Sequence, residues 1–183
     1  MSRLIDTSYF PIAADEIDYA EEAHAAGYAD LRARAEAEVI RWRSAQPIKE
    51  MVLAFGLPPM LGLYLVRFDR PIERGELAGE IEMWAVAGDL PPMCFETTDA
   101  PTPAEALRLY CAIAWDWGRA ALGRRDTSQC YPIQLEPTRE LGKMLLSRVK
   151  LLRKSWIPRA RRGLARARKA SRRAAIQQQR KLL

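Results

Sequence analysis

The strongest constraint on the fold is a short apolar run at residues 61–68, LGLYLVRF, which only Arg67 interrupts. Eight residues are few for a helix, and the β-favouring side chains of this run predict a strand that is covered on both faces. Asp69, Arg70 and Pro71, which follow directly, predict a turn or loop. Such a strand has to be packed against other elements on both of its sides.

A second strand is predicted by the alternation of residues 80–87. One side of this segment carries Ile81, Met83 and Ala85, and the other carries Glu80, Glu82 and Trp84. This pattern is typical of a strand with one buried and one exposed face. A five-residue connection at 88–92 leads into residues 93–97, which we expect to form the hairpin partner. The three segments together predict a small antiparallel sheet.

Long helices are predicted on both sides of these strands in the sequence. Residues 15–44 repeat apolar or small side chains every three or four positions. The clearest helix start is at Thr102, which forms a capping box with Glu105, and that helix is expected to end at Gly123. A last helix begins near Pro137. Its predicted buried stripe consists of Leu141, Leu145, Val149, Leu152 and Trp156.

These elements predict an α+β fold, in which a small antiparallel sheet of about three strands packs against long helices and a basic helical extension follows. The 183 residues, 49% of them hydrophobic, are enough for one domain with its own core. We expect a globular domain over residues 1–157 and an Arg-rich helical or disordered tail over 158–183. No apolar stretch approaches the roughly 18 residues that a membrane-spanning helix needs. Because no signal peptide is recognisable either, we expect a cytoplasmic protein without a transmembrane segment.

The charges of the chain are strongly segregated. Residues 139–183 hold 16 of the 29 Lys and Arg residues but only one of the 23 acidic residues, Glu140. The overall net charge of +6 therefore conceals an acidic body and a strongly basic tail. This asymmetry indicates interaction with nucleic acid, an anionic membrane or an acidic protein surface.

The basic tail is the clearest functional signal. Its candidate polyanion-binding residues are Arg159, Arg161, Arg162, Arg166, Arg168, Lys169, Arg172 and Arg173. Small side chains separate them, so a helix here buries little apolar surface and repels itself. Such a segment would bind DNA or RNA without sequence preference and with strong salt dependence. Two other interpretations stay open, namely that the tail binds an acidic protein or folds back onto the chain's own acidic residues.

Catalytic chemistry has little support in the sequence. His24 is the only histidine, and it lies on the apolar side of the first predicted helix, where a hydrogen-bonded core histidine is the usual outcome. Cys130 would need His24 as its base, and no neighbouring feature is predicted to stabilise its thiolate. Acidic pairs such as Glu80 and Glu82 are usually solvated. The sequence contains no phosphate-binding glycine loop or metal-ligand spacing, so we predict no catalytic residue, no metal site and no cofactor.

The cysteines point to a reducing environment. Cys94, Cys111 and Cys130 are odd in number and have no paired spacing. Buried, reduced thiols are therefore expected rather than a disulfide framework.

The end of the first hairpin strand and the connection that follows it carry a resemblance. Residues 84–91 read Trp-Ala-Val-Ala-Gly-Asp-Leu-Pro, and Pro103 and the pair Ala106 and Leu107 follow. This pattern resembles a family of small bacterial proteins with a Trp-x-Val-x-Gly-Asp-Leu-Pro hairpin, and similar hairpins occur in proteins that confer immunity to bacterial toxins. The resemblance implies an α+β fold and a bacterial cytoplasmic setting. It implies no catalytic residue.

The function expected from these features is that of a non-enzymatic intracellular binding protein. The first expectation is an immunity or antitoxin-type protein that neutralises a toxin or effector by direct protein–protein binding. Its candidate partner-binding residues are Asp15, Glu16, Asp18, Glu21, Glu22, Trp84 and Asp89. The connection that holds Asp89 is alternatively a purely structural turn under an aromatic core. The second expectation is a nucleic-acid-associated protein that binds DNA or RNA through the basic tail.

Overall fold

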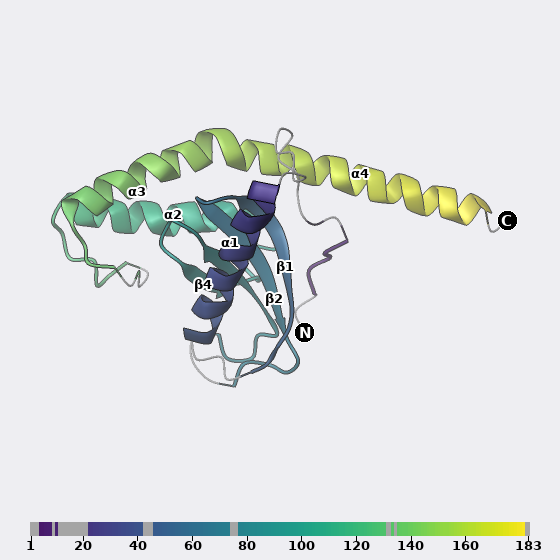
Figure 1. Ribbon diagram of the computed structural model, residues 1–183, viewed down its shortest axis with the longest axis horizontal. Helices are drawn as coiled ribbons and strands as arrows, with labels where there is room; N and C mark the ends of the chain where they lie inside the picture. Colours follow the sequence, from purple (N-terminus) through teal and green to yellow (C-terminus); the bar gives the residue numbers. More distant parts are fainter. Residues whose placement is uncertain are drawn as a thin grey trace.

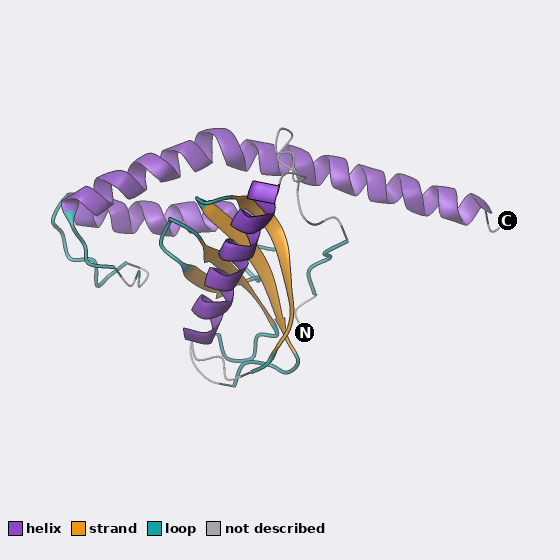
Figure 2. Cartoon of the chain, viewed as in Figure 1, coloured by secondary structure: helices purple, strands orange, loops and turns teal. Residues whose placement is uncertain are grey.

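The computed structural model describes residues 4–8, 10, 22–41, 46–73, 77–130, 133 and 135–181. The elements in chain order are α1 (Glu22–Arg41), β1 (Ile48–Leu57), β2 (Leu61–Phe68), β3 (Glu82–Ala87), β4 (Met93–Glu96), α2 (Pro103–Leu122), α3 (Arg139–Leu151), η1 (Leu152–Trp156) and α4 (Ile157–Lys181). The strands form one antiparallel sheet that has α1 on one face and the later helices on the other (Figure 2). The predicted α+β class is confirmed.

The sheet has four strands in the order β1-β2-β3-β4, one more than expected. The additional strand is β1. Its pairing with β2 is irregular between Ile48 and Glu50 and again between Leu53 and Phe55. Each irregularity shifts the side chains from one face of the strand to the other, so the period-two pattern that marks a strand in a sequence is lost.

The strands β2 and β3 both lie in the interior. β2 is buried along almost its whole length, as its apolar run predicts. The prediction of one exposed face on β3 is wrong, because all six of its residues are buried. Its alternation is real, but both faces are covered: Trp84 and Val86 point into the core with α2 and α3, while Met83 and Ala85 point toward α1.

Two apolar cores hold the layers together. On one face, Leu31, Ala35 and Val39 of α1 are buried against the sheet. On the other, the core includes Leu107 and Tyr110 of α2 together with side chains of α3, η1 and the first turns of α4. The helix periodicity predicted for residues 15–44 is confirmed from Leu31 to Val39 of α1, and residues 15–21 and 42–44 lie outside the described part of the chain.

The helix α2 begins and ends as its sequence predicts. The backbone N–H of Glu105 donates to Thr102 Oγ1 over 3.3 Å, and the Thr102 hydroxyl donates to the Glu105 carboxylate over 2.6 Å. At the other end, Gly123 N–H donates to the carbonyl of Arg119. The two contacts made by backbone N–H groups satisfy groups that a helix leaves unpaired at its ends, whereas the contact between the Thr102 and Glu105 side chains does not.

The last three elements form one continuous helical rod with a bend. α3 starts at the N-cap Thr138, and α4 continues from η1 without a break (Figure 1). In the π-helical turn η1, Ile157 N–H donates to the carbonyl of Leu152, five residues earlier. The rod changes direction at this turn in Figure 1, as is common where a helix contains a π-turn.

The buried stripe of the rod differs from its prediction at η1. Leu145, Val149 and Leu152 are fully buried as expected, but the next buried residue is Ile157, with Trp156 only partly buried beside it. The π-turn causes this shift, because it aligns residues five apart instead of four. Ala160 and Leu164 continue the buried stripe beyond residue 158. The division of the chain at residue 157 stays a prediction.

None of the helices in the described ranges combines the length and apolar character needed to cross a bilayer.

Candidate functional site

Trp84 is a core residue in this structure. Its side chain has no exposed surface, and its indole Nε1 donates a 2.7 Å hydrogen bond to the carbonyl of Ala100. A buried tryptophan usually pairs its N–H in this way. Trp84 thus offers no side-chain surface to a partner, in contrast to the role expected for it.

Asp89 lies at the surface, with half of its side chain exposed. One carboxylate oxygen is 3.5 Å from Arg34 Nη1 of α1. Its own N–H donates to the carbonyls of Pro59 and Met60, over 3.2 Å and 3.1 Å. Asp89 therefore combines a structural backbone contact with an accessible carboxylate, and its role in partner binding stays a prediction.

The connection that holds Asp89 is built around close packing on the β1–β2 turn. Gly88 has φ = +135°, and a Cβ at this position would lie 2.4 Å from the carbonyl oxygen of Met60. Next to it, Leu90 is buried and the carbonyl of Pro91 accepts a 3.1 Å hydrogen bond from Tyr110 Oη. The Gly-Asp-Leu-Pro segment thus has a structural explanation in this chain.

The acidic residues expected to bind a partner fall largely outside the described ranges. These are Asp15, Glu16, Asp18 and Glu21. Glu22 is the first residue of α1, and the backbone of His24 also lies in α1, but the side chains of both are outside the description.

The basic residues predicted in the tail lie on the helix α4. The element contains ten Lys and Arg residues and no acidic residue. Its buried side comprises Ile157, Ala160 and Leu164, and beyond Leu164 none of its described side chains is buried. In Figure 1 this half of α4 extends away from the sheet and the other helices. Arg161, together with most of the predicted polyanion-binding side chains, is exposed.

Arginines of the basic rod contact two tryptophans for which the sequence predicted no role in binding, one in the rod itself and one in α2. The Arg159 guanidinium lies 4.8 Å from the ring centroid of Trp156, and the Arg153 guanidinium lies 5.0 Å from that of Trp115. Both distances are typical of cation–π contacts. Trp115 belongs to α2, far from Arg153 in the sequence, so no local spacing could have revealed this pair.

A hollow of about 420 Å³ lies where the rod passes the β1–β2 turn. It is lined by apolar side chains, including Leu57, Met60 and Leu151, and by Asp89 and Arg148. Leu151 is 42% exposed. The hollow thus joins apolar surface to charges of both signs.

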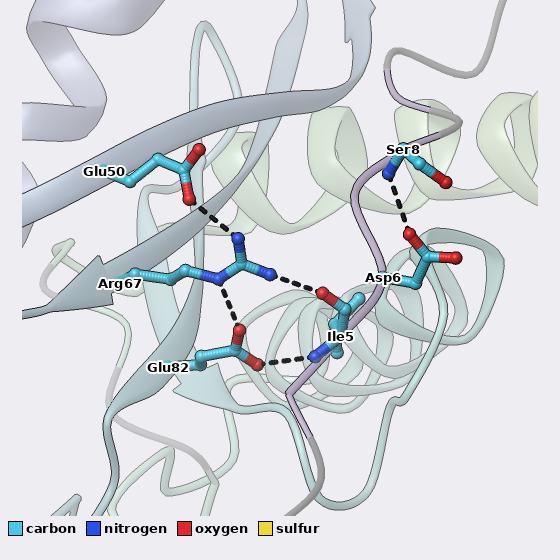
Figure 3. A network of polar contacts seen from close by, with 6 residues as sticks. All are labelled: Ile5, Asp6, Ser8, Glu50, Arg67 and Glu82. Atoms are coloured by element: carbon cyan, nitrogen blue, oxygen red, sulfur yellow. Dashed lines mark hydrogen bonds and ion pairs between the residues drawn. The ribbon is translucent and has the colours of Figure 1, made fainter.

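A partly buried ion network, with Glu82 as its buried member, ties the N-terminal segment to the sheet (Figure 3). Arg67 lies between two carboxylates, with Nε 2.6 Å from Glu82 Oε1 and Nη1 2.7 Å from Glu50 Oε2. The backbone of Ile5 closes the network, since its N–H donates to Glu82 and its carbonyl accepts from Arg67. Burial alone would lower the pKa of Arg67, but its hydrogen bonds to Glu82 and Glu50 raise it. Arg67 is therefore a permanent cation, and the Glu80/Glu82 pair is not a solvated one as expected from the sequence.

The cysteines are free in the structure. Cys94 and Cys111 are buried, whereas Cys130 is partly exposed. Burial raises the pKa of the Cys94 thiol far above its ordinary range, and it raises that of Cys111 to about 12 even though Arg153 lies nearby. Because the thiolate is the reactive form, the two buried thiols are held in the unreactive state at neutral pH.

We expect one fast-reacting thiol in the native protein. At pH 8 an aromatic disulfide reagent should modify Cys130. This pH is about four units below the pKa of Cys111, so Cys111 is thiolate in only about one molecule in 10,000. Three thiols should react in denaturant, and Cys130→Ser should abolish the fast phase. Rapid modification of two or three native thiols would contradict the burial of Cys94 and Cys111.

In the described ranges, no three His, Cys, Asp or Glu side chains come together as a metal-binding group. Comparison of the chain with protein-family models, with curated proteins and with solved structures gives no match.

Proposed function

We propose that this protein is a non-enzymatic binding protein that contacts nucleic acid through the exposed basic face of α4. The single observation that carries the proposal is a helix with ten cationic and no acidic side chains that projects from the folded body (Figure 1). We place nucleic acid ahead of a protein partner, the reverse of the order expected from the sequence, because a projecting helix with only positive charges suits an extended polyanion.

The dimensions of α4 suit a duplex. From Arg159 to Arg173 the helix rises by about 21 Å, and a helix with its side chains is about 10–12 Å wide. The major groove of B-DNA is about 12 Å wide and the duplex carries one charge per about 1.7 Å of its axis. Many phosphates thus lie within reach of the basic side chains, and the expected binding is independent of base sequence.

Phosphate contacts would also remove a cost that α4 carries when it is alone. Arg162 and Arg166, and likewise Arg168 and Arg172, are four residues apart on the same side of the helix. Like charges at this spacing destabilise a helix by a few tenths of a kcal/mol per pair, about 0.2–0.5. Neutralisation by phosphates relieves this repulsion, so binding and the helicity of α4 are coupled.

The test is the salt dependence of binding to a labelled 20-base-pair duplex. A triple variant, Arg161→Gln with Lys169→Gln and Arg172→Gln, removes three exposed cations of α4. Each phosphate contact contributes about 0.9 to the slope of log K against log salt, so the slope should become shallower by about 2.7. At about 0.1 M salt, the affinity should fall by roughly a hundred-fold or more.

The matched control removes three exposed cations from the body instead. Lys49, Arg70 and Arg108 lie outside α4, and their replacement by Gln changes the net charge by the same amount. The control should keep the slope of the natural protein and most of its affinity. Equal losses in the two triple variants would reduce the effect to net charge and refute a dedicated role of α4.

A second candidate is the direct neutralisation of a protein toxin or effector in the bacterial cytoplasm. The observation that favours it is the hollow beside the β1–β2 turn, where Trp156 and Arg159 accompany the exposed Leu151. Trp and Arg are enriched in the residues that dominate binding energy at protein interfaces. A stoichiometric protein complex that resists 1 M salt, and that is lost with Leu151→Glu but kept in the α4 triple variant, would favour this candidate.

A further inference from the structure

The indole of Trp115 lies, partly exposed, among basic side chains from two helices. The Arg153 guanidinium is 5.0 Å and the Lys150 ammonium 5.8 Å from the centre of its ring. Arg153 is held in place because its Nη2 donates a 3.0 Å hydrogen bond to the carbonyl of Cys111. Two cations, one of them held by a hydrogen bond, therefore lie over the aromatic ring where α2 meets the basic rod.

Two adjoining hollows share Trp115. Their volumes are about 410 Å³ and about 530 Å³, and Trp115, Arg119 and Arg125 line both of them. These volumes fall in the range typical of small-molecule sites, about 300–1,000 Å³. The first hollow has no acidic lining residue among those described, whereas the second is also lined by Asp116 and Asp126.

The end of α2 fixes the backbone positions of the two arginines. The carbonyl of Arg119 accepts from Gly123 N–H, and Arg125 N–H donates 2.9 Å to the carbonyl of Ala120. Between them, Arg124 takes up the left-handed conformation with φ = +52°. Neither Arg119 nor Arg125 forms an ion pair within the described part of the chain, so both guanidinium groups can bind an anion without breaking an existing pair.

We propose that Trp115 stacks against one unpaired base of a single-stranded nucleic acid, whose flanking phosphates bind Arg119 and Arg125. This inference rests on the proposed function and adds to it a contact that only single-stranded nucleic acid can make. Stacking on an aromatic ring beside cationic groups is how proteins bind single strands without reading their sequence, because every base has a π-face. An acidic peptide would use the arginines but would leave the aromatic surface unused.

The position of Trp115 connects this site to α4. Lys150 and Arg153 belong to the same continuous rod as the α4 residues. From Arg153 to Arg161 the rod rises by about 12 Å, at 1.5 Å per residue. This length corresponds to a few nucleotides at about 3.4 Å each. A strand whose phosphates lie along α4 can therefore reach the Trp115 hollow.

The test compares a labelled 16-nucleotide single strand with the duplex of the same sequence, using the full-length protein. Trp115→Leu keeps apolar bulk but removes stacking, and it should weaken single-strand binding by about ten- to a hundred-fold. Duplex affinity and the salt slope should stay unchanged, because stacking releases no counterions. Trp115→Phe should restore most of the single-strand affinity. The control is Met144→Ala, which removes an exposed apolar side chain of α3 and should change neither the single-strand nor the duplex affinity.

The outcomes separate this inference from the function on which it rests. If Trp115→Leu binds the single strand as tightly as the natural protein does, the stacking site is refuted. If the α4 triple variant has also lost binding to both nucleic acids, the proposed function still stands. Competition by a polyglutamate peptide as effective as by the single strand would also overturn it, since the site would then read charge alone. Absence of binding to either nucleic acid would refute both proposals. An unchanged thermal unfolding midpoint of Trp115→Leu establishes that the variant is folded.

Discussion

Replacing Arg67 with methionine is expected to lower the free energy of unfolding by about 3–5 kcal/mol, the usual cost of leaving a buried charge without its partner. The Glu82 side chain is only 4% exposed and has Arg67 as its counter-charge at 2.6 Å. Without Arg67, the remaining described contact of this carboxylate is the N–H of Ile5 (Figure 3). Urea denaturation of the variant and the natural protein, followed by circular dichroism, measures the difference.

The double variant Arg67→Met with Glu82→Gln tests the cause of this loss. Because the amide carries no charge, the double variant should recover a large part of the stability that Arg67→Met loses. Arg32→Ala serves as the control for an ordinary ion pair, since Arg32 and Glu36 are 55% and 43% exposed. An exposed pair of this kind contributes at most about 1 kcal/mol. If Arg67→Met were no more harmful than Arg32→Ala, the network would have no structural importance.

Gly88→Ala is the second substitution with a large expected effect, a loss of about 2–4 kcal/mol in the free energy of unfolding. Two costs combine at this position. An alanine would have to adopt φ = +135°, and its Cβ would lie 2.4 Å from the carbonyl oxygen of Met60. The contact cannot relax easily because the carbonyl oxygen of Met60 is a backbone atom of the tight β1–β2 turn. Thermal and urea unfolding measure the loss.

Gly79 separates the two costs. It also has a positive φ, +92°, but apart from its chain neighbours no described residue has an atom within 4 Å of a Cβ placed there. Gly79→Ala therefore lowers the free energy of unfolding through backbone strain alone, by about 1–3 kcal/mol, and should be the milder of the two substitutions. Equal destabilisation by both would mean that the contact of Gly88 with Met60 makes no separate contribution.

Local chemistry explains which parts of the fold were predictable. The ends of α2 depend on Thr102, Glu105 and Gly123, whose contacts all lie within a few residues. The sheet was harder to predict because the irregular pairing of β1 removes its alternation. In β3 the alternation of side chains was correct, but a strand pattern alone does not reveal that Glu82 faces Arg67 in the interior.

The candidate site was predictable only in its charge. The basic residues of α4 are adjacent in the sequence, so their concentration is visible without a structure. Trp115 meets Lys150 and Arg153 only through the packing of α2 on the rod, and Asp89 meets Arg34 only because α1 crosses the sheet. Contacts of this kind depend on tertiary packing and leave no signature in residue spacing.

The π-turn η1 determines which way the positive charges of α4 point. Leu152 and Ile157 are five positions apart, a separation that would turn the second side chain by about 140° from the first in a regular α-helix. The extra residue accommodated by the turn resets the rotational phase of everything that follows. Ile157, Ala160 and Leu164 then face the core, and the arginines between and after them face outward. The direction of the charged surface thus depends on the number of residues in η1. An insertion or deletion there would rotate the whole basic face about the helix axis without changing the sequence of α4.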